Sequence, residues 1–392
     1  MAADPHNVVR LILPRPADDS PGEEYQEAAL SLRQWLAEGI LVPDPEPALY
    51  VYEQAAVTAP GDEPIPVQRG LIGAVRLASP EAGIVLPHEN VSPGPVQGRL
   101  QLMEATRANL EPIFLLYDGD PEGSPRRLID AAATGTPLVE AVPGDGLRHR
   151  LWAITDPAGL AAIASDLAPR QALIADGHHR YAAYRALQDR RRRAGDGPGP
   201  WDFGLALLVD STAYPPEIGA IHRVIPGLRA DDAAKLAGAA FAVTELPGGT
   251  ADVAGAVAAL ESASATGPAF VVAGGERAYL LAEPDPAQAL NAMPAGVSPQ
   301  WRALPYSIMQ RLLIMKMWGL ADDDGCVRVV HHDARAAFRA AAAAGGTAVL
   351  CGPMTPAEVH AVAARGEKVP RKSTSFAPKP RTGLVLRTFA AG

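Results

Sequence analysis

Apolar residues recur along this chain either at helical spacing or in short, mostly unbroken runs. Within residues 23–39 they fall on one side of a helix, and Gly39 stands where a helix would end, so this spacing predicts an amphipathic helix. Short apolar runs bounded by turn residues predict buried strands. The strands predicted in this way in the first part of the chain cover residues 8–13, 48–53, 69–77, 113–117, 151–155, 171–175 and 203–210.

The composition changes near residue 228, and a second series of alternating elements follows. The helices predicted there cover residues 231–240, 251–263, 304–319, 332–344 and 356–365, and the strands cover residues 241–246, 268–273, 277–282, 326–331, 347–351 and 383–389. In the first part, further helices are predicted over residues 96–108 and 178–193. This order of elements is typical of an α+β or mixed α/β fold, and we expect the α+β class. We expect one domain at residues 1–228 and a smaller, mixed α/β domain at residues 229–392.

The composition agrees with a globular chain and excludes several classes of protein. Apolar residues make up 48% and charged residues 20% of the chain, which argues against disorder. The apolar runs are far shorter than the ~20 residues of a membrane span, so we expect no membrane partner. Two cysteines, Cys326 and Cys351, cannot build a disulfide framework, and residues 1–5 lack the apolar centre of a signal peptide. We therefore expect a cytoplasmic protein.

The charge of the chain restricts its partners. A net charge of −9 argues against broad nonspecific binding of nucleic acid, although it allows a local basic patch. Only five of the 35 basic residues are lysines, and three of these five fall within twelve residues near the C-terminus. The sequence leaves the oligomeric state open.

The strongest chemical signal directly follows a predicted strand. Asp176 and Gly177 form a tight turn, and the first turn of the next predicted helix carries His178, His179 and Arg180. A helix N-terminus presents unpaired N–H groups and a partial positive charge, so it suits an anion. Glycine lets a phosphate approach the backbone, and a guanidinium is a planar donor to phosphate. Asp176 is a candidate helix cap, cation ligand or base. The alternative is that it only caps the helix and that both histidines are surface residues.

Two further histidine-containing pairs are candidates. His88 and Glu89 follow a strand-like run and suit a general base, a phosphate contact or half of a metal site, with a plain polar loop as the alternative. His222 and Arg223 repeat the His–Arg pairing of the central motif. This second pair is as well suited to face the same anion site as to lie away from it.

A basic, hydroxyl-rich block near the C-terminus completes the candidate residues. It contains Lys372, Ser373, Thr374 and Lys379, which together suit phosphate or an acidic substrate. A solvated basic loop is the alternative. No cluster has the ligand spacing of a zinc site. A Mg²⁺ ion held mainly by nucleotide phosphates would leave little trace in the sequence, so the metal ligands stay unknown.

Several of these blocks occur in the order found in a bacterial and archaeal family known as domain of unknown function 1015. The chain resembles this family over nearly its whole length. The matching blocks are His6–Leu11, His88–Glu89 with Arg99 and Asn109 downstream, Ile174–Tyr181, Ile221–Arg223, Pro370–Pro380 and Thr382–Leu384. Family members usually carry some tens of residues before the first block. The resemblance therefore implies that this chain is truncated at its N-terminus or that its start codon is misassigned.

The segment from Gly177 to Tyr184 also resembles the signature of the ParB/sulfiredoxin superfamily. Its members include sulfiredoxins, CTP-binding partition proteins and a free-serine kinase that uses ADP. The resemblance implies that residues 1–228 form a ParB/sulfiredoxin-like domain with a mixed sheet, which holds nucleotide phosphates at the helix start. His178 stands where sulfiredoxins have a cysteine, so reduction of a sulfinic acid, which needs a thiolate, is not expected. Phosphate binding does not depend on that cysteine.

These observations predict a nucleotide-dependent phosphotransferase or nucleotide hydrolase that acts on a small hydroxylated metabolite. The nucleotide would be ATP, ADP or CTP with Mg²⁺. The candidate catalytic residues are Asp176, His178, His179 and Glu89. The candidate nucleotide-binding residues are Gly177, Arg180, His88, His222, Arg223, Lys372, Ser373, Thr374 and Lys379. Two alternatives remain: a nonenzymatic, nucleotide-gated or DNA-associated regulator, and a metal-dependent hydrolase.

Overall fold

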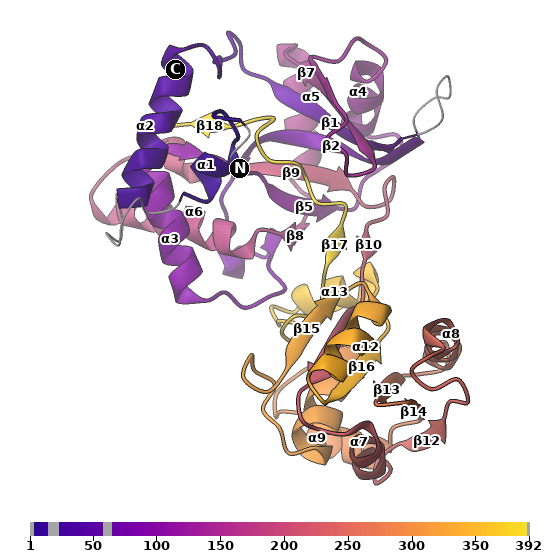
Figure 1. The fold of residues 1–392 in the computed structure, drawn as a ribbon. Helices are drawn as coiled ribbons and strands as arrows, with labels where there is room; N and C mark the ends of the chain where they lie inside the picture. The colour runs from indigo at the N-terminus through magenta and orange to yellow at the C-terminus, as the bar shows by residue number, and fades with distance from the viewer. Residues whose placement is uncertain (1–3, 15–22, 58–64, 390–392) are drawn as a thin grey trace. The chain divides into compact units, whose positions relative to one another are not determined.

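The computed structural model of the chain describes residues 4–14, 23–57 and 65–389. Two compact units divide the chain (Figure 1): Met1–Pro216 together with Pro378–Gly392 form unit 1, and Glu217–Ala377 form unit 2. The chain thus leaves unit 1 after residue 216 and returns to it at residue 378. The sequence predicts a single boundary, after residue 228. The difference arises because β10(Glu217–Ile218) and β11(Ile221–Ile225) pair with strands of unit 2.

The core of unit 1 is an eight-stranded mixed sheet with the strand order β3-β8-β5-β9-β2-β1-β7-β6. Its strands are β1(Leu49–Ala56), β2(Ile65–Arg76), β3(Val85–Leu86), β5(Ile113–Tyr117), β6(Val139–Ala141), β7(Leu147–Ile154), β8(Ala172–Asp176) and β9(Phe203–Asp210). The β3–β8 and β5–β9 pairs are parallel, and the other neighbouring pairs are antiparallel. The expected α+β fold with a mixed sheet in the N-terminal part is confirmed.

Helices cover this sheet at both ends of its strand order. Those of unit 1 are α1(Val9–Ile12), α2(Glu23–Ala37), α3(Pro93–Thr106), α4(Ser124–Ala132), α5(Pro157–Leu167) and α6(His178–Arg193), with short 3-10 turns at Pro80–Ala82 and Pro200–Asp202. Apolar residues of α3 and α6 pack on β5, β8 and β9, whereas α4 and α5 pack on β1 and β7. Burying these apolar faces is the main force that fixes α6 against the end of β8.

One predicted strand of unit 1 is wrong. Residues 8–13 were expected to be extended, but Val9–Ile12 form the short helix α1. Its Leu11 is fully buried in a cluster with residues of α2 and α3. The Asn7 side chain accepts a hydrogen bond from the Val9 N–H (3.0 Å), which favours a helical turn over a strand. Tertiary packing and this local bond therefore override the β-branched composition.

Unit 2 contains a six-stranded antiparallel sheet with the order β12-β14-β13-β16-β11-β15. Besides β11, the strands of this sheet are β12(Ala242–Glu245), β13(Phe270–Gly274), β14(Arg277–Ala282), β15(Arg328–His331) and β16(Thr347–Cys351). The strands β10 and β17(Phe376–Ala377) form a separate antiparallel pair. Its helices are α7(Ala230–Ala237), α8(Val253–Ser264), α9(Pro286–Ala292), α10(Pro299–Ala303), α11(Pro305–Ser307), α12(Ala334–Ala343) and α13(Pro356–Ala363), and Ile308–Met317 form a π-helix. Alanines of α8 and α12 pack on the sheet, since their small side chains permit close approach.

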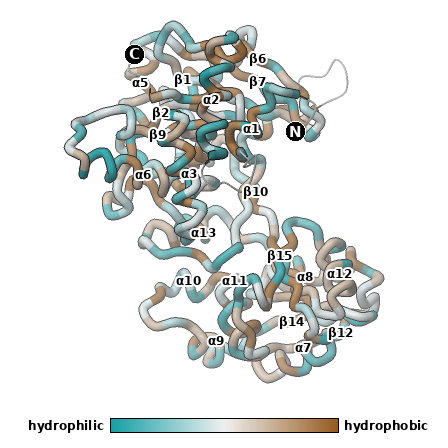
Figure 2. Tube along the Cα trace, turned by 60° about the vertical axis from the view of Figure 1, so that its left-hand side comes forward, coloured by the Kyte–Doolittle hydropathy of each residue, from teal (hydrophilic) through white to brown (hydrophobic). Residues whose placement is uncertain are grey.

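After β17 the chain returns to unit 1, along the yellow segment of Figure 1. Of the strand predicted at residues 383–389, only β18(Arg387–Thr388) is found, and it pairs with β4(Ala108–Asn109). Brown, hydrophobic stretches follow many of the strands in Figure 2. In the described part of the chain, no helix has the length and apolar character that crossing a membrane would require.

Candidate functional site

The turn between β8 and α6 is built around one glycine. Gly177 has φ +97°, a backbone conformation that side chains rarely adopt, and directly precedes the first residue of α6. A Cβ atom on Gly177 would lie 3.0 Å from Ile113 Cγ2 and 3.1 Å from Arg180 Nε. The carbonyl of Gly177 accepts the first helical bond, from Tyr181 N–H (2.9 Å). The predicted strand–turn–helix therefore stands at the predicted residues, and the turn leads into the N-terminus of a 16-residue helix.

Two cations meet one carboxylate at this turn. Arg180 Nη2 lies 2.5 Å from Asp176 Oδ2, and Lys379 Nζ lies 2.6 Å from Asp176 Oδ1. Arg180 also donates to the Pro112 carbonyl, which holds the guanidinium beside the turn. The side chain of Lys379 is 58% exposed and that of Asp176 is 23% exposed, so the ammonium faces solvent on one side. Asp176 therefore offsets one of the two positive charges.

The two histidines of the motif hold a loop against the helix. The backbone N–H of His88 donates to His178 Nε2 (3.2 Å), and the backbone N–H of Ser92 donates to His179 Nε2 (3.1 Å). A ring nitrogen that accepts carries no proton, so each neutral ring carries its proton on Nδ1. His178 Nδ1 lies 3.7 Å from Glu89 Oε2. This loop therefore places Glu89 beside the helix start.

The histidine pair His88 and His178 is buried and closely packed. His88 is fully buried and His178 nearly so, and their rings meet edge to face with centroids 4.4 Å apart. The sequence left open whether the motif's histidines are exposed surface residues; for His178 the burial excludes that alternative. Glu89 keeps about a third of its side chain exposed, so it can reach a bound molecule.

The carboxyl of Asp176 is held ionised. Burial alone would raise its pKa, but the charges of Arg180 and Lys379 outweigh burial and lower the pKa below its ordinary value. A lowered pKa in the folded state stabilises the fold above the unfolded pKa of about 3.9, and this contribution disappears as the pH falls through the folded value.

Asp176→Asn is therefore expected to lower the free energy of unfolding near neutral pH. The difference from the native chain should shrink as the pH falls from about 4 through the lowered folded-state pKa, because only below that pKa is the native carboxyl protonated in both states. Urea unfolding at a series of pH values measures this difference. A difference that stays constant down to the lowest pH would contradict the pairing of Asp176 with its two cations.

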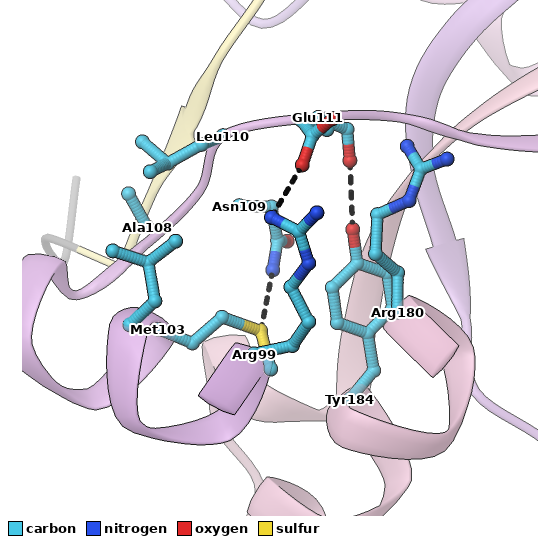
Figure 3. A pocket seen from close by; sticks show the side chains of 9 residues that line it. Arg99, Met103, Ala108, Asn109, Leu110, Glu111, Arg180 and Tyr184 are labelled. Carbon is cyan, nitrogen blue, oxygen red and sulfur yellow. Dashed lines mark hydrogen bonds and ion pairs between the residues drawn. The ribbon is translucent and has the colours of Figure 1, made fainter. Parts of the chain in front are cut away.

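A small pocket lies between α3, α6 and the segment around β4, and Arg180 is among its lining residues (Figure 3). Its volume is about 20 Å³, enough for about one water molecule. Arg99 pairs with Glu111 (2.9 Å), and Tyr184 donates to the Glu111 carbonyl (3.0 Å). Arg99 thus serves an internal ion pair in this structure. The pocket is too small for a nucleotide.

The second predicted His–Arg pair lies in unit 2, on β11. Arg223 is 1% exposed and donates to the carbonyls of Ile221, Arg371 and Lys372 at 3.0, 3.1 and 2.9 Å. His222 is buried too. Burial and the neighbouring charge of Arg223 lower its pKa to about 4, so the ring is neutral at neutral pH. Both side chains serve the fold of unit 2, and this corrects the expectation that Arg223 faces an anion site.

The C-terminal block is divided between the two units. Ser373 is fully buried and its hydroxyl donates to the Pro370 carbonyl (2.7 Å), so the expected phosphate contact of this hydroxyl is corrected to a turn contact. Lys372 is exposed, has φ +51° and offers its carbonyl to Arg223, and Thr374 is half-buried beside it in unit 2. Of this block, only Lys379 belongs to unit 1 and reaches Asp176.

Unit 1 therefore gathers seven of the candidates besides Lys379: Asp176, Gly177, His178, His179, Arg180, His88 and Glu89. Three contributing residues were not predicted from the sequence: Pro112, whose carbonyl holds Arg180, and the buried Gln54 and Gln68, which contact residues 378 and 379. Polar side chains within strands were the available signal for the two glutamines.

Within residues 4–14, 23–57 and 65–389, no group of three or more His, Cys, Asp or Glu side chains is arranged to hold a metal ion.

Comparisons with known proteins agree with one resemblance seen in the sequence. The profile of the family described as "Protein of unknown function (DUF1015)" matches residues 1–307. No curated protein matches the chain. Solved structures that are similar include a free serine kinase in complex with AMP, with 14% identity, coverage of 78% of this chain and 87% of that chain, and a TM-score of 0.37.

Two further solved structures are similar to the same degree. A conserved hypothetical protein from Pyrococcus furiosus has 14% identity, coverage of 78% of this chain and 90% of that chain, and a TM-score of 0.35. SbnI with a C-terminal truncation, from Staphylococcus aureus, has 13% identity, coverage of 79% and 84%, and a TM-score of 0.38.

Proposed function

The chain belongs to the DUF1015 family, and from its own site we propose that it transfers a phosphoryl group from a nucleotide to the hydroxyl of a small metabolite. The observation that carries this proposal is the turn at Gly177, where a helix N-terminus, Arg180 and Lys379 converge. The local resemblance to the ParB/sulfiredoxin signature supports the choice of a nucleotide. By the same resemblance, an amino acid with a hydroxyl group is the proposed acceptor.

The charges at the turn suit the phosphates of a nucleotide. The N-terminus of α6 carries a partial positive charge that suits phosphate oxygens, and Gly177 has no side chain to obstruct their approach. The Lys379 ammonium and the Arg180 guanidinium would offset the negative charge that develops on the transferred group. A Mg²⁺ ion, where required, would be held mainly by the phosphates.

Glu89 is the proposed general base. The acceptor oxygen attacks the terminal phosphorus while its proton passes to the Glu89 carboxylate. The bond from phosphorus to the bridging oxygen breaks, and the leaving nucleotide keeps that electron pair. His178 lies 3.7 Å from the Glu89 carboxylate through its Nδ1 and keeps this group beside the turn. Asp176 holds the two cations, and His179 holds the loop at Ser92.

Arg180→Ala tests the site. We expect nucleotide affinity, measured by calorimetry with ATP, ADP and CTP in the presence and absence of Mg²⁺, to fall about tenfold or more, because a charge-assisted hydrogen bond contributes about 1.5–3 kcal/mol. Arg185→Ala, on the same helix but paired with Gln188 and Asp189, is the matched control and should bind normally.

The calorimetry also separates the alternatives. Unchanged affinity in Arg180→Ala would remove the phosphate site from this turn. Tight nucleotide binding without turnover against a panel of hydroxylated metabolites would favour the nucleotide-gated regulator over the phosphotransferase.

A further inference from the structure

We propose that residues 378–381 form a strap whose backbone is held by buried side chains of the unit 1 sheet, so that Lys379 is positioned on Asp176. Gln54, Gln68 and Tyr52 are then positioning residues, which act on the site only through the strap. The consequence for nucleotide affinity rests on the proposed function. The placement of Lys379 itself does not rest on the proposed function.

The first support is a pair of buried glutamines. Gln54 on β1 and Gln68 on β2 are direct cross-strand neighbours, 1% and 4% exposed. Gln68 Nε2 donates to Gln54 Oε1 (2.9 Å) and to the Pro378 carbonyl (3.3 Å), and Gln54 Nε2 donates to the Lys379 carbonyl (3.1 Å). A buried amide without a partner costs about 1–3 kcal/mol, so these two amides strongly specify where the strap lies.

The second support holds the other end of the strap. The Arg381 N–H donates to the Tyr52 hydroxyl (3.2 Å), which lies 2.7 Å from His149 Nδ1. His149 Nε2 lies 3.1 Å from Asp145 Oδ2, and the same oxygen lies 2.6 Å from Arg381 Nη2. Tyr52 and His149 are buried, so this closed ring of contacts has little freedom to move.

The positions along β1 explain why one face holds the whole strap. Tyr52 and Gln54 are two residues apart, so they point to the same face of the sheet. His149 on β7 is the cross-strand neighbour of Gln54. The intervening Glu53 points to the other face, where it pairs with Arg69 and Arg150. The polar side chains on the first face therefore contact the backbone of residues 378, 379 and 381.

This attachment matters because a lysine side chain is long and flexible. A free lysine would lose up to ~2 kcal/mol of conformational freedom on meeting a phosphate. A backbone fixed on both sides of Lys379 restricts where its ammonium can reach, and the ion pair with Asp176 completes the placement. The site would therefore bind with an ammonium already in place.

Gln54→Met tests the strap, since methionine has a similar volume but no amide donor. In the native chain, acylation of Lys379 by an amine-reactive reagent, followed by mass spectrometry, should be severalfold slower than that of the exposed Lys235. Gln54→Met should raise the rate at Lys379 severalfold and leave Lys235 unchanged. Gln68→Met should act in the same direction.

A double-mutant cycle provides the second measurement. Gln54→Met and Lys379→Ala should each lower nucleotide affinity severalfold or more, whereas adding Gln54→Met to Lys379→Ala should have no further effect. Gln54→Glu, which cannot donate an amide hydrogen to the carbonyl, should not restore affinity. Thermal unfolding of each variant verifies that it is folded.

The outcomes separate this inference from the proposed function. If no nucleotide binds the native chain, the proposed function fails, but the acylation rates still test the strap. Equal rates at Lys379 and Lys235 in the native chain, or a Gln54→Met rate equal to the native one, would overturn the strap. Additive losses of affinity in the double variant would also overturn it, because Gln54 would then act by another route.

Discussion

Glu89→Gln should lower the turnover number by about 10²- to 10⁴-fold, the usual contribution of a general base, while nucleotide affinity stays close to the native value. The amide keeps the size of the side chain and its place next to His178, but it cannot take the proton of the acceptor hydroxyl. Steady-state kinetics with a responsive hydroxylated metabolite give the turnover number, and calorimetry gives the affinity. This division between turnover and binding is specific to a base, since a binding residue would change affinity first.

Glu81→Gln is the matched control for this experiment. Glu81 lies eight positions earlier in the chain, on an exposed 3-10 turn outside the site. Its variant should keep native turnover and native affinity. A Glu89→Gln variant with native turnover would remove Glu89 from the chemistry, and equal losses in both variants would point to a general effect on folding.

Gly177→Ala should remove detectable nucleotide binding and also lower the free energy of unfolding by about 1–3 kcal/mol. The backbone at φ +97° disfavours any side chain, and the new methyl group would crowd Ile113 and the Arg180 guanidinium. The methyl group would also project from the turn that a phosphate has to approach. Calorimetry and urea unfolding measure the two effects separately.

Gly195→Ala separates backbone strain from loss of the site. Gly195 follows the other end of the same helix and has φ +87°, and no described residue other than its immediate neighbours in the chain lies within 4 Å of the place that its new methyl group would take. Its alanine variant should lose a similar amount of stability and keep native nucleotide affinity. Loss of affinity in both variants would show that destabilising α6 is sufficient, and the special role of Gly177 would be withdrawn.

Local signals in the sequence predicted the centre of the site well. The strand, the Asp–Gly turn and the helix at 178–193 occur at the predicted positions because each depends on neighbours within a few residues. The helix predicted at 23–39 was also found, as Glu23–Ala37, since its apolar stripe faces a core. The strand predicted at residues 8–13 was wrong because the burial of Leu11 against α2 determines the conformation of this segment, and no local sequence pattern indicates such a contact.

Contacts between distant parts of the chain explain the remaining differences. Arg223 and Ser373 have the right chemistry for phosphate, but burial in unit 2 commits them to carbonyl groups. Gln54 and Gln68 lie more than 300 positions before the carbonyls that they hold. Residue type alone cannot distinguish an amide that faces solvent from one that secures a returning segment of the chain.

The order of synthesis has a consequence for this site. Lys379 follows Asp176 by 203 positions, and all of unit 2 lies between residue 216 and residue 378. A ribosome therefore makes the turn, Glu89 and Arg180 long before it supplies the second cation. A chain that stops early, or that a protease shortens from its C-terminus to before residue 379, would carry the turn with one cation in place of two. Completion of the translated chain thus becomes a condition for a complete site.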